Sequence, residues 1–194
     1  MSTIKATNIQ HPSAASPNLV LASDGTVSGG AGLGGLVHIA TEVVSTGVSN
    51  LSFDNCFSSD YENYLLVATI VASSGSNQLF MRFRSGGSDD SSSAYITQTL
   101  QASSTSVTGY RDSSLTDKAS LTVYSTILAA FETKFFSPNL ATNSNYHGWG
   151  DENGDNMYFK TGRFNNATQF DGFSLFPGGG TFTGTFRIYG YANS

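Results

Sequence analysis

The chain has 194 residues, of which 9 are Lys or Arg and 14 are Asp or Glu, and its formal net charge is −5. This length suits one domain, or one domain with an arm, and such sparse charge argues against long charged helices, coiled coils and electrostatic capture of nucleic acid. A hydrophobic fraction of 39% argues against disorder, so the polar surface must come largely from the 29 Ser, 20 Thr, 14 Asn and 21 Gly residues.

Residues 1–35 differ from the rest of the chain because they contain no aromatic residue and end in a glycine-rich tract. The prolines in this segment favour extended backbone, and the glycines are typical of a flexible joint. A phosphate-binding loop at 29–35 is the weaker alternative, because no Lys-Ser or Lys-Thr follows it. The segment therefore predicts an extended attachment arm, whose contacting residues are Ile4, Ile9, Pro12, Pro17, Leu19 and Leu21.

The first ten residues are polar, and no apolar run approaches the roughly 18 residues that cross a bilayer. We therefore expect no secretory signal, no membrane span, and synthesis in the cytoplasm. The lone Cys56 excludes an internal disulfide and a multi-cysteine metal site. It is interpreted as a small apolar filler beside Phe53 and Phe57.

From residue 36 onward, apolar and polar residues alternate with a period of two, and β-branched and aromatic residues are enriched. This pattern predicts strands, separated by stretches rich in Ser, Gly, Asn and Asp. A polar loop is expected at 85–93. The predicted strands cover 36–44, a short segment ending at 53, 64–72, 78–84, 95–102, 119–131, 134–136, 145–149, 157–160, 170–176 and 181–191.

Helical periodicity is nearly absent, and no repeat of 20 to 50 residues indicates a solenoid or propeller. About ten to twelve short strands with turn signals between them favour an antiparallel packing. The predicted fold is all-β: an antiparallel β-sandwich of jelly-roll type over 36–194, with the extended N-terminal arm over 1–35.

Catalytic signatures are weak. A Ser-His-acid triad needs a histidine, and the chain has only His11, His38 and His147, with no Gly-x-Ser-x-Gly motif. Most of the carboxylates that could pair as in a glycosidase lie in predicted turns, where turn chemistry explains them. We therefore expect no enzyme, no catalytic residue and no cofactor.

Residues 151–156 carry oxygen ligands at alternate positions, which is similar to the start of a calcium loop. The glycine falls at the fourth position of this stretch instead of the sixth, and Gly162 stands where a closing Glu is needed. Asn153-Gly154 is also a strong hairpin signal, so a tight turn is the favoured interpretation. A surface calcium site completed by other loops stays open.

Aromatic residues of the C-terminal third could form a shallow surface for carbohydrate, because rings stack on sugars and amides hydrogen-bond to them. The alternative is that most of these rings alternate into the core. The candidate ligand-facing residues are Tyr146, His147, Trp149 and Tyr158.

Several stretches together resemble virion structural proteins of tailed bacteriophages. Residues 4–27 are similar to the attachment leader of fibre and appendage proteins. Residues 57–64 and 79–88 resemble β-sandwich modules of such proteins, and 172–176 with 184–191 completes the same module. The similarity spans most of the chain and is compositional in character.

The resemblance implies a non-enzymatic, repeated and often trimeric building block of the virion, made in the bacterial host cytoplasm. The leading hypothesis is a fibre- or spike-type appendage, in which the arm binds other virion proteins and the sandwich faces outward. One alternative is a capsid decoration or cement protein. Another is a lectin-like module that binds a host surface glycan.

Overall fold

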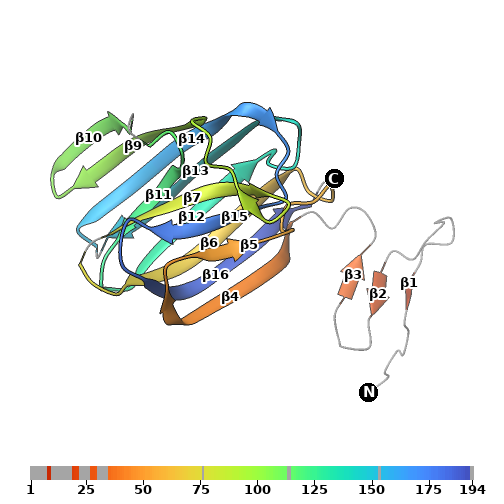
Figure 1. The fold of residues 1–194 in the computed structure, drawn as a ribbon. Coiled ribbons are helices and arrows are strands. Elements are labelled where there is room, and N and C mark those ends of the chain that lie inside the picture. The colour runs from red at the N-terminus through yellow and green to blue at the C-terminus, as the bar shows by residue number, and fades with distance from the viewer. Residues whose placement is uncertain are drawn as a thin grey trace, which may run out of the picture.

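The computed structural model describes residues 35–75, 77–112, 115–152 and 154–192, together with the backbone of three short strands nearer the N-terminus. The described chain is all-β, with two antiparallel sheets packed face to face (Figure 1). No helix in these ranges is long and apolar enough to cross a bilayer. The three short strands pair antiparallel as a small separate sheet of β1 (Asn8–Ile9), β2 (Leu19–Leu21) and β3 (Val27–Gly29).

The larger sheet of the sandwich has eight strands, and its two edges are formed by β10 and β4. All of its neighbouring strands are antiparallel. In order across the sheet, the strands are β10 (Ser106–Arg111), β9 (Tyr95–Ser103), β14 (Asn156–Thr168), β13 (Thr142–Glu152), β12 (Ala129–Phe136), β6 (Asn63–Ala72), β16 (Phe182–Tyr191) and β4 (Leu36–Val48).

The smaller sheet has five strands and covers the inner face of the larger one. Its strands are β11 (Ala119–Tyr124), β7 (Asn77–Ser85), β15 (Gly172–Pro177) and β5 (Leu51–Phe53), with β8 (Ser88–Asp89) paired to β7.

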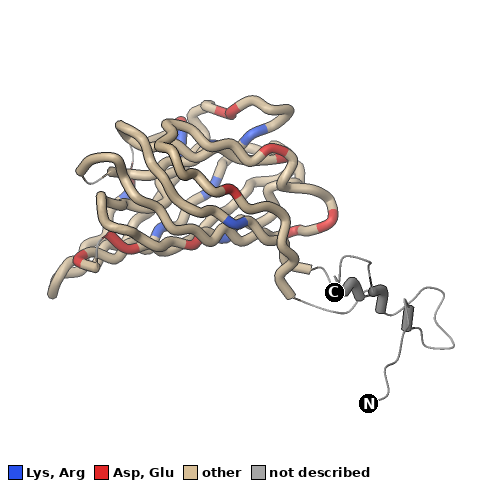
Figure 2. The backbone as a smooth tube through the Cα atoms, turned by 90° about the horizontal axis from the view of Figure 1, so that it is seen from below, with Lys and Arg blue, Asp and Glu red and all other residues tan. Residues whose placement is uncertain are grey.

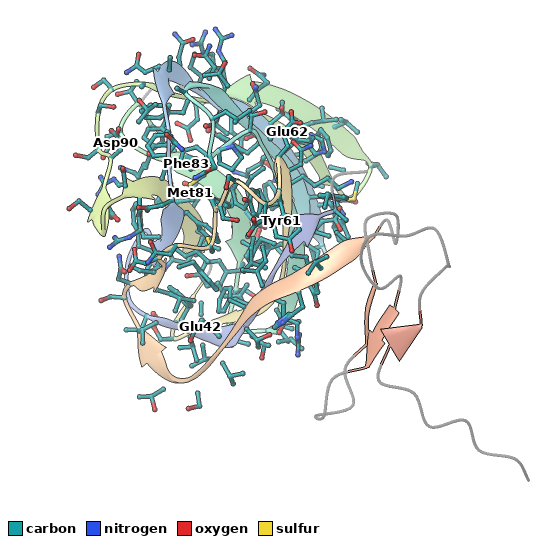
Figure 3. The ribbon with its side chains drawn as sticks, turned by 90° about the vertical axis from the view of Figure 1, so that its right-hand side faces the viewer. Glu42, Tyr61, Glu62, Met81, Phe83 and Asp90 are labelled. Carbon is teal, nitrogen blue, oxygen red and sulfur yellow. The ribbon has the colours of Figure 1, made fainter. Side chains whose placement is uncertain are left out.

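Aromatic rings fill the part of the core beneath β7 and β15. Met81 and Phe83 alternate inward from β7 and lie between the sheets (Figure 3). The Phe83 ring stacks on Phe170 with centroids 4.7 Å apart, and four more rings surround it. Cys56 is buried in the same cluster, and burial raises the pKa of its thiol, which agrees with the interpretation of this residue as an apolar filler.

The other part of the core, beneath β11, is polar. Lys160 points inward from β14 and is only 1% exposed, and its Nζ donates to Ser120 Oγ at 2.5 Å. The Gln78 amide donates to the same hydroxyl at 2.6 Å. Burial lowers the pKa of Lys160 to about 8, because the charged ammonium is poorly solvated there. The core is therefore divided into an aromatic part and a part built on buried hydrogen bonds.

The strand predictions hold for most of the sandwich, with three differences. The predicted strand 119–131 is two strands in different sheets, β11 and β12, because the chain crosses from one sheet to the other between them. The predicted loop 85–93 contains the tight β7–β8 turn, in which Gly86 and Gly87 both adopt positive φ. Strand β10 follows β9 as a hairpin that the alternation pattern did not indicate.

The all-β fold and the two antiparallel sheets are thus confirmed. Of the six predicted arm contacts, Ile4, Pro12 and Pro17 lie outside the described residues. Ile9, Leu19 and Leu21 belong to the small sheet of β1 and β2, where the structure describes the backbone alone.

Candidate functional site

The outer face of the eight-stranded sheet is the surface on which a functional site is most clearly built. Residues that alternate outward from its strands form rows across the sheet, because antiparallel partners share a face. In one row Leu100 of β9 is opposite Phe159 of β14, which is opposite Trp149 of β13. None of these three side chains is covered by another described element.

Large apolar side chains gather at this row and at the neighbouring row that contains Val107 and Met157. Their exposed fractions range from 44% for Trp149 to 67% for Val107. A contiguous exposed apolar surface is unusual on a soluble domain and marks a contact site. We call this surface the apolar patch; it consists of Leu100, Val107, Trp149, Met157 and Phe159.

His147 continues the patch on the side of Trp149 that faces away from Met157. Its ring lies 5.0 Å from the Phe136 ring and 6.2 Å from the Phe159 ring, measured between centroids. Phe136, His147 and Tyr191 also line a shallow hollow of about 280 Å³. A second hollow, of about 140 Å³, lies between Trp149 and Arg187.

A third hollow, of about 390 Å³, lies at the β10 side of the patch. Arg111 of β10 is opposite Gln98 of β9, one row along from Leu100. Arg163 of β14 lies one row further, opposite Asn145 on one side and Ile96 on the other. The two arginines, Gln98 and Asn145 therefore line one depression. We call it the arginine hollow; it is lined by Ile96, Gln98, Arg111, Asn145, Thr161, Gly162 and Arg163.

The cations on the two faces of the sandwich differ in whether they form ion pairs. Charged residues are sparse along the backbone, as Figure 2 shows. Within the described ranges, no ion pair involves any of the four cations of the outer rows, which are Arg111, Lys134, Arg163 and Arg187.

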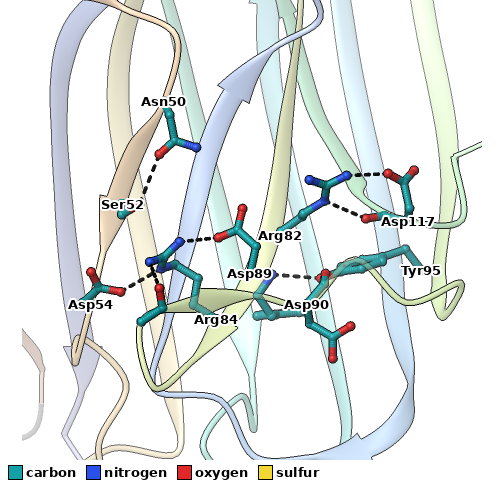
Figure 4. Close-up of polar contacts among 11 residues, drawn as sticks. Asn50, Ser52, Asp54, Arg82, Arg84, Asp89, Asp90, Tyr95 and Asp117 are labelled. Atoms are coloured by element: carbon teal, nitrogen blue, oxygen red, sulfur yellow. Dashed lines mark hydrogen bonds and ion pairs between the residues drawn. The ribbon is translucent and has the colours of Figure 1, made fainter.

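The opposite face, on the smaller sheet, has its cations paired. Arg82 donates through Nε to the Asp117 carbonyl at 3.0 Å and forms an ion pair with the Asp117 carboxylate (Figure 4). Arg84 forms ion pairs with both Asp54 and Asp89. These contacts assign Asp89 and Asp117 to structural roles.

Aromatic rings on this opposite face are covered as well. The Arg82 guanidinium lies 5.0 Å from the Phe176 ring centroid, and the Lys118 ammonium lies 5.3 Å from that of Phe80. Each cation therefore shields a ring from solvent. Among the described surface residues, the exposed rings of Trp149 and Phe159 and the cations without an ion pair therefore lie on the outer face of the larger sheet.

The four candidate ligand-facing residues divide between the two sides of the larger sheet. His147 and Trp149 point outward, as a binding role requires. Tyr146 and Tyr158 point inward and are 1% and 5% exposed, so they do not share the outer face with His147 and Trp149, and the prediction is corrected for that face. The physical reason is the strand period of two, which sends Tyr146 and His147 to opposite faces. Tyr158 instead lines a separate hollow of about 630 Å³ with Phe80 and Tyr110.

The 151–156 segment forms the end of β13, a turn and the start of β14. The Asp151 carboxylate accepts a hydrogen bond from the Ala130 N–H at 2.8 Å, and Glu152 accepts one from the Tyr158 hydroxyl at 3.0 Å. Both acids therefore have structural partners. Among the described side chains, no group of three His, Cys, Asp or Glu is placed to hold a metal ion.

The contact between Ser120 and Lys160 has the composition of a Ser–Lys nucleophile pair, with the pKa of the lysine lowered by burial. Both residues are buried, however, and the Ser120 hydroxyl also accepts from Gln78. A substrate carbonyl has no approach to this oxygen. The pair is therefore assigned to the structure of the core.

Comparison with known proteins adds no relative, since no family model matches the chain and no curated protein matches its sequence. The outer face is therefore the basis for inferring a function, and sequence reasoning had identified His147 and Trp149 on it. It had missed Met157, Phe159, Arg111 and Arg163. The outward positions in β14 are the signal that could have found Met157, Phe159 and Arg163, because they alternate with the buried ones.

Proposed function

We propose that this chain is a non-catalytic structural protein of a tailed-phage virion, a fibre- or spike-type appendage that displays the outer face of its larger sheet toward the host. The apolar patch, uncovered and bordered by unpaired cations, is the observation that carries this proposal. The resemblance of the sequence to phage appendage proteins supports the same assignment.

The proposal includes the jelly-roll type of the sandwich, the N-terminal arm as the anchor to other virion proteins, and a homotrimer. Successive strands alternate between the sheets at β5, β6 and β7 and again at β14, β15 and β16, which supports a jelly roll. The edge strands β10 and β4 each have one described neighbour, so their free backbone groups offer a place for further copies.

Oxidative footprinting of intact virions tests the display of the patch. We expect Trp149 and Met157 to be oxidised in free particles and to become protected severalfold when the particles adsorb to host cells, because the patch is then covered. Met81 is fully buried and serves as an internal control that stays protected throughout.

Protection of Trp149 and Met157 already in the free particle would place the patch against a neighbouring virion protein. That outcome contradicts the appendage and favours capsid decoration, and a particle map showing copies between capsid subunits would establish it.

Deletion of residues 1–27 tests the anchor. We expect the truncated chain to fold and to be missing from particles, whereas normal incorporation would rule out the arm as the attachment segment.

A further inference from the structure

We infer that the outer face binds an acidic saccharide, with a sugar carboxylate in the arginine hollow and a neighbouring sugar ring on Phe159 and Trp149. This inference rests on the proposed function, because it names the ligand of the same displayed face. It adds a ligand class, an orientation on the surface and two arginines that recognise the acid.

The charge of the outer rows selects an anionic ligand. Arg111, Lys134 and Arg163 have no described ion-pair partner, although the chain as a whole carries a net charge of −5. Glu132 and Asp151 are the carboxylates of the described outer rows, and Asp151 is held by the Ala130 N–H. Neither of them lines the arginine hollow.

The groups around the arginine hollow fit a carboxylate in particular. A guanidinium presents parallel N–H donors to the two oxygens of a carboxylate, and charge-assisted bonds of this kind are stronger than neutral ones. Gln98 lies beside Arg111 on the side of β14, and Asn145 lies beside Arg163 on β13, so both amides can bind the neighbouring sugar hydroxyls.

The register places stacking rings next to these donors. Thr161, which lines the hollow, is two residues from Phe159 on β14, so the ring is the next outward side chain of the same strand. Trp149 is directly opposite Phe159 on β13. A chain of two sugars laid along β14 therefore reaches the hollow with one unit and the rings with the other, and its apolar ring face covers part of the patch.

A second copy of this chain is the competing occupant of the face. If two copies packed face to face about a twofold axis, each copy would bring the same four outer cations and only two outer carboxylates, Glu132 and Asp151, to the contact, since such an interface is self-complementary. Like charges brought together without counter-ions oppose this contact. The unpaired arginines therefore favour an acidic ligand over a second copy.

Titration of the full chain with polygalacturonate, dextran and inorganic phosphate tests the inference, with Trp149 fluorescence as the reading. Trp149 is the single tryptophan of the chain, so its signal reports on this face alone. We expect polygalacturonate to change the emission and bind in a salt-sensitive manner, neutral dextran to bind far more weakly, and phosphate to compete without reproducing the change.

The double substitution Arg111→Gln with Arg163→Gln should weaken polygalacturonate binding by roughly tenfold to a hundredfold, because two charge-assisted contacts are lost. Lys118→Gln is the control, since it removes a cation of the opposite face, and binding should stay near that of the unsubstituted chain. Unchanged melting of the variants shows that they fold.

Equal binding of dextran and polygalacturonate, or no loss in the double variant, overturns the inference. Phosphate alone producing the full emission change also overturns it, because the hollow is then a simple anion site. If no saccharide binds while footprinting still shows protection on host cells, the acidic ligand is wrong and the displayed contact face stands. If the saccharide binds while footprinting shows no protection on host cells, the proposed host contact is wrong and the acidic ligand stands.

Discussion

Replacing Lys160 by Met is expected to stabilise the protein at neutral pH by roughly 3 kcal/mol, which corresponds to a rise in melting temperature of about 5 to 10 °C for a domain of this size. Lys160 is 1% exposed, and its ammonium has a single described hydrogen-bond acceptor, Ser120 Oγ. The Tyr158 ring centroid lies 5.6 Å from the ammonium and the Asp112 carboxylate attracts it, but burial outweighs both. Removing such a charge is favourable when an apolar side chain of similar length fills the space. The Ser120 hydroxyl keeps its hydrogen bond from Gln78.

The pH dependence of unfolding identifies the cause. The pKa of Lys160 is about 8 in the folded protein and 10.5 in its ordinary state. Below pH 8 both states hold the proton, so folding bears the full cost of burying the charge. Between these two values the unfolded chain binds more protons than the folded one, and the free energy of unfolding therefore rises with pH.

Above about pH 10 buried tyrosines act in the opposite direction. Burial raises the pKa of Tyr124 to about 12 and also raises that of Tyr146. Their unfolded counterparts ionise first, so stability falls again in that range. The protein should therefore be most stable near pH 10, where the rise ends and the fall begins, and Lys160→Met should remove the rising limb and leave the fall.

Chemical denaturation at several pH values measures the free energy of unfolding of the unsubstituted chain and of Lys160→Met. Lys134→Met, on the outer face, is the control, and it should leave the rise between pH 8 and 10 in place. A loss of stability in Lys160→Met at pH 7 would mean that the hydrogen bond to Ser120 outweighs the desolvation of the ammonium, and would contradict the interpretation of the polar core.

The alternation of apolar and polar residues was enough to predict the two-layer antiparallel fold, because each half-buried strand carries its face assignment in its own sequence. It failed at 119–131, where the residues around the crossing between sheets are themselves apolar and read as one continuous strand. A sheet change leaves no trace in a period-two pattern unless a turn signal interrupts it.

The candidate site was predictable only in part, for a related reason. Trp149 and His147 lie two positions apart on one strand, so local sequence is enough to place them on one face. Arg111 and Arg163 lie on different strands far apart in the chain, and they meet only because β9 pairs with both β10 and β14. Cross-strand register depends on the whole sheet, and a single sequence does not contain it.

The same register explains why Gly162 is expected to be the least replaceable glycine of the larger sheet. It lies opposite Tyr146 of β13 and Thr97 of β9. The Tyr146 side chain passes over it to reach β9, where its hydroxyl donates to the Ile96 carbonyl at 3.1 Å and bonds to Thr97 Oγ1 at 2.5 Å. A bare α-carbon on the middle strand lets one buried tyrosine join the two strands on either side.

Gly162→Ala should therefore destabilise the fold by about 3 kcal/mol or more, at the upper end of what overpacking costs. The added Cβ would lie 2.1 Å from the Ile96 carbonyl oxygen and 2.3 Å from the Tyr146 hydroxyl, and the first of these contacts is with backbone that has little room to move. Gly109→Ala in β10 is the matched control. Its Cβ meets nothing closer than 3.9 Å, so this change should be neutral or slightly stabilising.

Thermal and denaturant unfolding of both variants, together with Tyr146→Phe, separates the two parts of the effect. Tyr146→Phe removes the hydroxyl contacts and keeps the ring, so it should cost about 1 to 2 kcal/mol, well below the cost of Gly162→Ala. If Gly162→Ala were no more damaging than Gly109→Ala, the strands β9, β14 and β13 could not be packed as closely as described. The register that places Arg163 between Ile96 and Asn145 would then lose its basis as well, because the arginine hollow depends on the same pairing of β9, β14 and β13.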